Sequence, residues 1–378
     1  MPVFVKGVGM LPVKDHWDKS GVDLATDAAL LALDDANLKP KEIDMLLVSN
    51  MTCEFDNMQL NLATAILDAL GIKNKPVARI ESACSSGGVA IFTGFRMVKG
   101  GMRNVLVVGV EKLMDVLTPE NTAAMMLAED YDWTFISGAT FPSLNALALR
   151  YYMHRYNIPH EDIMMFPVIE HDHGYLNPLA QFRRKITLEM VKNSPMVADP
   201  IHILESSSLG DGAAALVLTS DETDVEISGA GLAIDYFKLY DREDPLVLLG
   251  VVKAAKKAYE MAHLTPKDIQ IAEVHDAFSI TGILGIEALG LAGKGEGAKL
   301  AKNEELRLNG RLPTNTFGGL KARGHPVGAT GIYEVAEVAL QLRGDAGNNQ
   351  VDGVKIGIAE NIGAVGSSAT VFILTKKT

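Results

Sequence analysis

The chain of 378 residues is acidic, with a formal net charge of −12, and 48% of its residues are hydrophobic. This length predicts two or three domains with large cores, and the negative charge argues against nucleic acid and anionic membranes as partners. Two cysteines, Cys53 and Cys84, are too few for a disulfide framework or a zinc cluster. The N-terminus lacks a basic signal-peptide region and no apolar run is long enough for a membrane span, so we expect a cytoplasmic protein.

The first hundred residues predict strands that alternate with helices. Residues 3–10 and 45–50 form strand-like apolar runs, and residues 24–36 carry apolar side chains at helical spacing between them. A second helical pattern ends at Leu70 and Gly71, and a further strand is expected at residues 104–109. This order is typical of βαβ units.

Cys84 lies in the sequence ESACSSGGVA at residues 81–90, between an apolar run and a helical pattern at residues 89–99. We therefore expect it at a strand-to-helix turn, where free N–H groups and the helix dipole stabilise a thiolate. Its small neighbours leave room for a substrate. These features favour a nucleophile, and the alternative is a buried structural cysteine.

Residues 114–200 are rich in methionine and aromatic side chains and interrupt this pattern, so we interpret them as an insertion. They contain helical patterns at residues 143–156 and 187–193. His171 and His173 stand at alternate positions of an expected loop, a spacing that is common by chance, and no metal site is predicted there. A turn and a buried strand at residues 206–218 return to the first sheet.

The remaining chain repeats the first unit, with ANLKPKEID at residues 36–44 matched by AHLTPKDIQ at residues 262–270. The repeat predicts an α/β fold of two duplicated βαβ halves with mostly parallel sheets. We expect an N-terminal half (1–113 with 201–222), an inserted loop domain (114–200) and a C-terminal half (223–378). The polar stretch at residues 293–310 is expected to be an exposed loop.

If the halves pack as pseudo-twofold mates, the turn of Cys84 meets the equivalent turn GHPVGATG at residues 324–331. His325 then lies among turn residues, which favours a catalytic base over a core histidine. His275 follows an apolar run and is expected at a strand end. The neighbouring Asp276 could orient another group or cap the following helix.

Five segments resemble the thiolase superfamily, and together they span the whole chain. They read SACSSG at 82–87, GDGAA at 210–214, HDAF at 275–278, GHPVGATG at 324–331 and GAVG at 363–366. HDAF, with NPLAQFR at 177–183 and MVADP at 196–200, is similar to the sterol-carrier-protein-type and archaeal branch. The resemblance implies α/β/α/β/α layers with an inserted loop domain that binds coenzyme A, in a homodimer or tetramer.

The same resemblance implies an acetyl-CoA C-acetyltransferase, which joins two acetyl-CoA molecules into acetoacetyl-CoA and CoA, or runs the reverse, for mevalonate and isoprenoid synthesis. Cys84 would become acetylated, and His325 would activate it. His275 would help to bind the thioester oxygen, or would belong to the hydrogen-bond network behind the site. A second oxyanion hole would use the N–H groups of Cys84 and Gly363. No cofactor is expected beyond the coenzyme A thioester substrates.

The second acid/base of thiolases has no evident equivalent. Ordinary thiolases carry a cysteine just before the last glycine motif, where this chain has Asn361. The sterol-carrier-protein-type branch can place one within the HDAF block, where this chain has Ala277, and Cys53 matches neither position. Because an amide is no base at neutral pH, His275 is the candidate for this role.

An acidic chain must supply local positive charge for the phosphates of coenzyme A. The candidates are Arg183, Arg184 and Lys185 in the insertion and Lys321 near the second turn. The alternative for each is an ordinary solvated surface charge. The resemblance further implies a complex with hydroxymethylglutaryl-CoA synthase and a small zinc-ribbon/OB-fold protein.

Two rival functions remain open at this stage. The first is cleavage of longer 3-ketoacyl-CoA thioesters, or acyl transfer to a different acceptor, and the absence of the second cysteine favours it. The second is a non-catalytic subunit that binds acyl-CoA as a scaffold. The presence of both Cys84 and His325 within full motifs argues against a scaffold, which would need neither.

Overall fold

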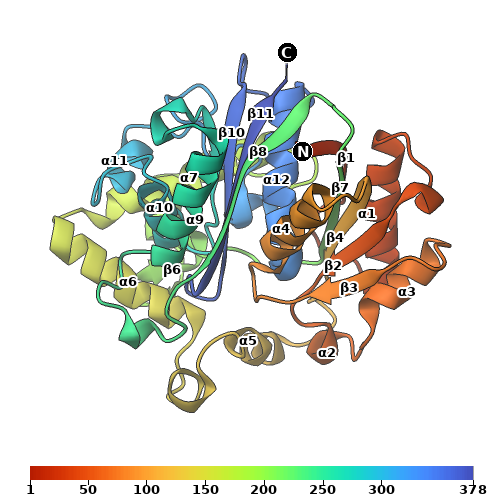
Figure 1. The fold of residues 1–378 in the computed structure, drawn as a ribbon. Helices are drawn as coiled ribbons and strands as arrows, with labels where there is room; N and C mark the ends of the chain where they lie inside the picture. Colours follow the sequence, from red (N-terminus) through yellow and green to blue (C-terminus); the bar gives the residue numbers. More distant parts are fainter. Residues whose placement is uncertain (378) are drawn as a thin grey trace.

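The computed structural model describes residues 1–377. Its main sheet has nine strands in the order β3-β2-β4-β7-β1-β8-β11-β10-β9 (Figure 1). A separate pair consists of β5 (Met196–Ala198) and β6 (Ile201–His202). The strands of the main sheet are β1 (Phe4–Met10), β2 (Met45–Ser49), β3 (Val77–Ile80), β4 (Asn104–Glu111), β7 (Gly212–Thr219), β8 (Val225–Ile234), β9 (Ile271–Glu273), β10 (Ile356–Gly363) and β11 (Ser368–Lys376).

The sheet consists of two equivalent halves, which confirms the predicted duplication. β1, β2, β4 and β7 have the same relative order and direction as β8, β9, β10 and β11. A parallel bridge from Ala272 to Thr314 stands where β3 pairs with β2 in the first half. The halves join edge to edge through the pairing of Phe4 with Glu226.

Helices complete the five predicted layers, α/β/α/β/α (Figure 1). The outer layer on the first half contains α1 (Gly21–Asp35) and α3 (Leu62–Ala69). The outer layer on the second half contains α9 (Leu249–Ala262), with α10 (Ser279–Ala288) beside it. Between the halves, α4 (Ser86–Lys99) and α12 (Thr330–Arg343) contact strands of both.

The central strands are apolar on both faces because each face meets a helix layer. In β7, Ala213, Ala215 and Val217 pack into the outer core of the first half, whereas the alternate residues pack into the central core with α4 and α12. Successive side chains of a strand point to opposite faces, so a strand between two helix layers reads as a continuous apolar run.

The prediction of mostly parallel sheets was wrong. Parallel pairing is confined to β2–β3, β2–β4 and β9–β10, and the other pairs of the main sheet are antiparallel. β10 and β11 are joined by a turn at residues 364–367, and a connection this short permits only antiparallel pairing. β4 and β7 form the equivalent pair, so residues 112–211 occupy the place of that turn.

Residues 114–200 fold mainly as helices; the domain boundaries given above stay a prediction. α6 (Phe141–Tyr156) and α8 (Leu188–Lys192) match the expected patterns. α5 (Thr118–Met126) and α7 (His160–Leu176) were not predicted. α7 is buried on most sides, so its apolar residues show no helical period.

The prediction of an exposed loop at residues 293–310 was also wrong in part. It contains α11 (Gly297–Lys302), whose Ala298, Leu300 and Ala301 are buried and which packs against α7. No helix within residues 1–377 is long and apolar enough to cross a membrane. The remaining short helical segments are α2 (Cys53–Asp56), η1 (Pro40–Glu42), η2 (Tyr131–Phe135), η3 (Ile203–Glu205), η4 (Leu239–Asp241), η5 (Pro266–Asp268), η6 (Gly319–Arg323), η7 (Val327–Ala329) and η8 (Gly347–Asn349).

Glycines let the N-terminal ends of α4 and α12 touch. A Cβ atom added at Gly331 would lie 2.5 Å from the backbone nitrogen of Gly88. A Cβ atom added at Gly88 would lie 1.9 Å from Oγ1 of Thr370 in β11. Both distances are far below van der Waals contact, so only glycine fits. The turns that precede the two helices are thereby brought side by side.

We expect Gly88→Ala to lower the free energy of unfolding by about 1–3 kcal/mol, because overpacking must push α4 away from β11. The matched control is Gly21→Ala at the start of α1, where the nearest atom to an added Cβ is 3.8 Å away. Urea denaturation followed by circular dichroism measures both variants. Equal unfolding midpoints for the two variants would contradict the close-contact argument.

Candidate active site

Cys84 lies in the turn between β3 and α4, as the sequence predicted. The turn is held by Ser86, whose Oγ accepts a hydrogen bond from the Ser82 N–H (2.8 Å) and donates one to the Ala83 carbonyl (2.5 Å). Ala83 has a φ of +51°, a left-handed conformation that is unfavourable for a residue with a side chain. The thiol of Cys84 is buried, and the nearby Ala364 N–H favours its thiolate form.

His325 lies in the equivalent turn before α12. Its backbone N–H donates to the Ser208 carbonyl (2.8 Å), and its Nδ1 lies 2.7 Å from Oγ1 of Thr330. When Oγ1 of Thr330 accepts a hydrogen bond from Nδ1–H, the lone pair of the neutral ring is on Nε2. Glu111 secures the turn, because its carboxyl accepts hydrogen bonds from the N–H of Gly328 in the second half and from the N–H of Met51 in the first half.

His275 follows β9, and Asn361 determines which of its ring nitrogens carries the proton. Oδ1 of Asn361 accepts the Gly88 N–H (3.2 Å), so the amide group of Asn361 faces Nδ1 of His275 (3.0 Å) and donates to it. The proton of the neutral ring is therefore assigned to Nε2. The His275 N–H donates to Glu360 (2.9 Å), which fixes the backbone at this strand end.

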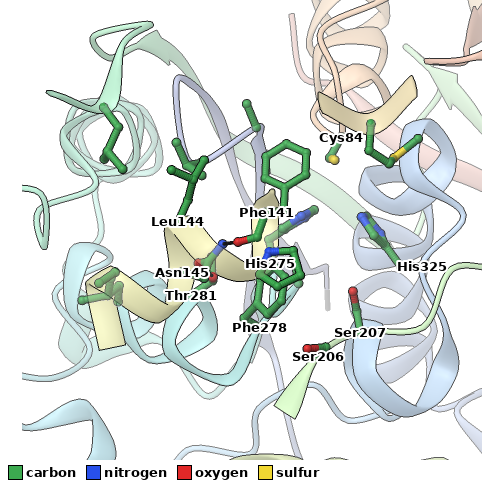
Figure 2. A pocket seen from close by; sticks show the side chains of 18 of the residues that line it. Cys84, Phe141, Leu144, Asn145, Ser206, Ser207, His275, Phe278, Thr281 and His325 are labelled. Carbon is green, nitrogen blue, oxygen red and sulfur yellow. Dashed lines mark hydrogen bonds between the residues drawn. The ribbon is translucent and has the colours of Figure 1, made fainter. Parts of the chain in front are cut away.

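The fold brings these three side chains to one point. The Cys84 sulfur, a ring nitrogen of His275 and a ring nitrogen of His325 all lie within 4.8 Å of one another. The two imidazoles meet edge to face, with ring centroids 5.2 Å apart. Figure 2 shows them beside Cys84 at one end of a cavity.

All three groups are electrically neutral at rest because water is excluded from them. Burial raises the pKa of the Cys84 thiol to about 12 and outweighs the hydrogen bond from Ala364. Burial, together with the charge of Arg323, lowers the pKa of His275 to about 3. Burial, His275 and Arg323 hold the pKa of His325 well below its usual range. Burial therefore opposes the thiolate that a helix N-terminus favours, and Cys84 needs a base.

A buried charged network lies behind the two histidines. The Arg323 guanidinium is 1% exposed; its Nε lies 2.9 Å from Oε1 of Glu337, and the group stacks over the ring of Tyr333. Burial raises the pKa of Glu334 and Glu337 on the same helix. The sequence analysis missed this network. Its signal was two glutamates, three residues apart, inside the apolar stretch that follows the His325 turn.

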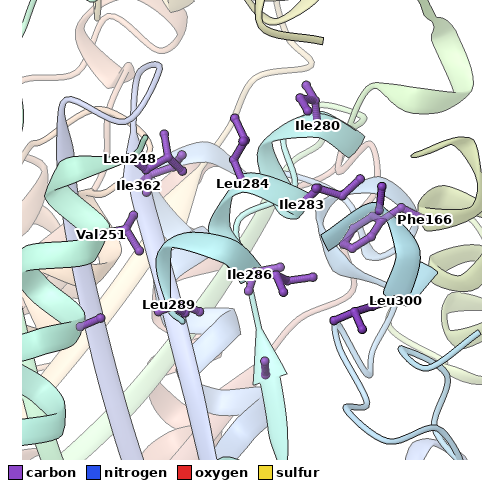
Figure 3. Close-up of a cluster of buried hydrophobic side chains, with 14 of the residues drawn as sticks. Phe166, Leu248, Val251, Ile280, Ile283, Leu284, Ile286, Leu289, Leu300 and Ile362 are labelled. Carbon is purple, nitrogen blue, oxygen red and sulfur yellow. The ribbon is translucent and has the colours of Figure 1, made fainter. Parts of the chain in front are cut away.

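The cavity has a volume of about 250 Å³, and its walls are mostly apolar. Two of its few polar groups, Thr281 and Asn145, hydrogen-bond each other (2.8 Å; Figure 2). Leu248 and Leu284 connect the wall to the buried cluster shown in Figure 3. The other apolar side chains of the wall include Met125, Met126, Phe141, Leu144, Ala148, Val197, Leu209, Leu239, Phe278 and Val365.

None of the four basic residues proposed for coenzyme A lines this cavity. Arg183, Arg184 and Lys185 are exposed between α7 and α8, and Lys185 lies 3.6 Å from Asp172. Lys321 is buried in η6 and donates to the Ser206 carbonyl (2.8 Å), and burial lowers its pKa to about 8. A role of these residues with phosphate stays a prediction.

The alternative roles of Asp276 are resolved in favour of orientation. Its Oδ1 accepts the Leu320 N–H (2.8 Å) and its Oδ2 accepts the Lys321 N–H (3.0 Å), so it holds η6 just before the His325 turn. It does not cap α10, whose first turn receives no hydrogen bond from a side chain at its N-cap, Phe278.

Gly363 ends β10 beside the Cys84 turn, and an added Cβ would lie 2.6 Å from the Ser82 carbonyl oxygen. The N–H that meets the sulfur of Cys84 belongs to the next residue, Ala364. The predicted oxyanion hole of Cys84 and Gly363 N–H groups stays a prediction. Ala364 is a donor that the sequence analysis did not identify.

His171 and His173 lie on α7, and the expectation that they stand on a loop was wrong. Both are buried, and their Nδ1 atoms donate to the backbone carbonyls of Arg184 (2.8 Å) and Asn315 (3.0 Å). Burial lowers the pKa of each to about 4, so both rings are neutral. Within residues 1–377, neither belongs to a group of three or more side chains with metal-ligand geometry.

Comparison with known proteins agrees with this geometry. Residues 12–222 match the family model for the thiolase N-terminal domain, and residues 231–376 match the thiolase C-terminal domain-like model. The chain is 42% identical to a protein of Methanothermobacter thermautotrophicus named acetyl-CoA acetyltransferase, over 99% of both chains. It is 32% identical to human sterol carrier protein 2, over 97% of this chain and 70% of that protein.

The fold also matches a solved structure described as the Ltp2-ChsH2(DUF35) aldolase. The TM-score is 0.86 at 24% identity, over 99% of this chain and 98% of that chain. The two family models together cover most of the chain, and both occur in the predicted order. The chain therefore belongs to the thiolase family of acyltransferases.

Proposed function

We propose that this protein is an acetyl-CoA C-acetyltransferase, which joins two acetyl-CoA molecules into acetoacetyl-CoA and CoA and also catalyses the reverse thiolysis. The observation that carries the proposal is the meeting of Cys84, His275 and His325 within 4.8 Å at the end of a mostly apolar cavity. The relative of Methanothermobacter thermautotrophicus with this name supports the choice of reaction.

In the first half-reaction, Nε2 of His325 accepts the thiol proton as the Cys84 sulfur attacks the thioester carbonyl of acetyl-CoA. The developing oxyanion accepts hydrogen bonds from fixed donors, for which the candidates are the Ala364 N–H and Nε2–H of His275. The C–S bond to coenzyme A then breaks, and the His325 imidazolium protonates the leaving thiolate. The products are acetyl-Cys84, free CoA and neutral His325.

In the second half-reaction, a base removes a proton from the methyl carbon of a second acetyl-CoA, and the carbanion attacks acetyl-Cys84. Asn361 donates to Nδ1 of His275, which supports a role of Nε2–H as a donor to the thioester oxygen. We therefore assign the second base to His325, which is neutral again after CoA leaves. Attack releases the Cys84 thiolate, which takes the proton back from His325.

The apolar cavity favours a second candidate, transfer of acyl groups longer than acetyl. Its walls include Phe141, Leu144, Leu248 and Leu284, more apolar surface than a two-carbon group can cover. Relative kcat/KM values for thiolysis of acetoacetyl-CoA, 3-ketohexanoyl-CoA and 3-ketooctanoyl-CoA separate the two. A steady rise with chain length would replace the acetyl assignment.

We further propose that the protein is a cytoplasmic homo-oligomer that feeds mevalonate synthesis, in a complex with hydroxymethylglutaryl-CoA synthase and a small zinc-ribbon/OB-fold protein. A fold neighbour whose description contains a DUF35 component supports a partner protein of this kind. Co-expression of all three followed by affinity purification of one tests the complex. Recovery of the tagged protein alone would remove this part of the proposal.

Thiolysis of acetoacetyl-CoA tests the roles of the three side chains. Cys84→Ala should abolish turnover and the acetyl adduct seen by mass spectrometry. His275→Leu should lower kcat by about 10²–10³-fold, because an oxyanion donor is lost, whereas His275→Asn should keep more activity through its amide N–H. If His275→Leu forms acetyl-Cys84 at the normal rate yet fails to condense, His275 is the second base. If the wild-type protein shows neither turnover nor an acetyl adduct, the remaining function is that of a non-catalytic subunit that binds acyl-CoA.

Alkylation by iodoacetamide tests the resting state of Cys84, since only the thiolate reacts. With a pKa of about 12, the rate should rise about tenfold per pH unit from about pH 7 to about pH 10 without a plateau. The Cys84→Ser variant measures the alkylation that is due to Cys53 alone. Cys53 is also buried, and burial raises its pKa to about 12. A plateau below about pH 9 would show a thiolate-stabilising site instead.

A further inference from the structure

The turn that joins β10 to β11 presents an N–H group to the sulfur of Cys84. This turn, residues 364–367, begins with Ala364, which lines the same cavity as Cys84 and whose N–H favours the thiolate form of that cysteine. Ala364 has a φ of +54°, so a residue with a side chain is held in the left-handed conformation. Such a conformation persists only where surrounding contacts enforce it.

Two buried side chains from distant segments hold the residue that follows Ala364. Oε1 of Glu129, which follows α5 in the insertion, accepts the Val365 N–H (2.9 Å). Nη1 of Arg242, in the connection between β8 and α9, donates to the Val365 carbonyl (2.9 Å). The backbone N–H and the backbone carbonyl of Val365 are therefore both hydrogen-bonded by side chains.

The burial of these two side chains is costly, and little else explains it. Glu129 is 3% exposed, and among the described residues its carboxyl forms a hydrogen bond only with Val365. Burial raises its pKa to about 7. Arg242 is 9% exposed and is accompanied by Asp235, whose Oδ2 lies 3.4 Å from Nε. Buried polar groups with so few partners are retained only where the contacts they make are valuable.

We propose that Glu129 and Arg242 are positioning residues that clamp Val365 and thereby aim the Ala364 N–H at the reacting centre. The clamp acts on the sulfur through the backbone of the turn, and Arg242 also lines the cavity. The effect of the clamp is to stabilise negative charge on the Cys84 sulfur, and then on the thioester oxygen to which this charge moves during acyl transfer. The second part of this inference rests on the proposed function, whereas the effect on the sulfur does not.

The clamp can be separated from a plain charge effect with a matched pair of variants. Glu129→Gln keeps an oxygen that accepts the Val365 N–H, whereas Glu129→Leu keeps only the volume. The negative charge of Glu129 by itself raises the pKa of Cys84. A charge effect therefore predicts faster alkylation of Cys84 in both variants. A clamp predicts alkylation at least as fast as wild type in Glu129→Gln and slower alkylation in Glu129→Leu.

The experiment measures iodoacetamide alkylation of Cys84 at about pH 9, and kcat and KM for thiolysis of acetoacetyl-CoA. We expect Glu129→Leu and Arg242→Ala to lower the alkylation rate and kcat by about 10–100-fold with KM changed less than about twofold. Arg242→Lys should fall between Arg242→Ala and wild type. Glu243→Gln is the control, because Glu243 is exposed on the same connection as Arg242 and should leave both rates unchanged.

Equal behaviour of Glu129→Gln and Glu129→Leu, or unchanged alkylation in all four clamp variants, would overturn the proposal. Urea unfolding midpoints establish that each variant is folded. If Glu129→Leu fails to fold, the alkylation rates of the Arg242 variants still test the clamp, because they should increase from Arg242→Ala to Arg242→Lys to wild type. Alkylation needs no acyl substrate. If wild type performs no thiolysis while the alkylation order holds, the proposed function falls and the clamp stands.

Discussion

The contact between α4 and α12 in the central layer determines where the chemistry can take place. The two helices meet backbone to backbone at their N-terminal ends, because Gly87 and Gly331 carry no side chain. Each helix is preceded by a turn with one reactive side chain, so the contact places Cys84 beside His325. Two halves that are far apart in sequence thus contribute to one site, and a larger residue at either glycine would separate them.

Exclusion of water sets the chemical state of that site. Burial favours neutral forms, so the thiol of Cys84 keeps its proton and both imidazoles remain uncharged. In such surroundings, hydrogen bonds from fixed partners decide what each group can do. Thr330 leaves Nε2 of His325 able to accept a proton, and Asn361 leaves Nε2–H of His275 able to donate a hydrogen bond. The amide at position 361 is thus no substitute for a second base; it donates to Nδ1 of His275 and so fixes which ring nitrogen carries the proton.

The two halves differ most in the connection between their last two strands. In the second half this is a short turn, which carries Ala364 to the sulfur of Cys84. In the first half it is expanded to residues 112–211, which contribute Glu129 and cavity-lining residues such as Phe141. The internal repeat thus gives two equivalent halves, and the expansion of one connection adds the residues that form a wall of the cavity.

The sequence by itself predicted the strands of the main sheet except β11, the central helices and the duplication, because periodicity and internal repetition can be read from a single chain. It predicted the meeting of Cys84 with His325 only on the condition that the two halves pack as pseudo-twofold mates. It did not reveal α7, whose burial on most sides erases the helical period, or the antiparallel pairing of β7 and β11. The bond from Asn361 to His275, the Arg323 network and the contacts of Glu129 and Arg242 were decided only by tertiary structure. Each joins segments distant in sequence, and both charge state and hydrogen-bond partner depend on which atoms are packed together and on how much water they exclude.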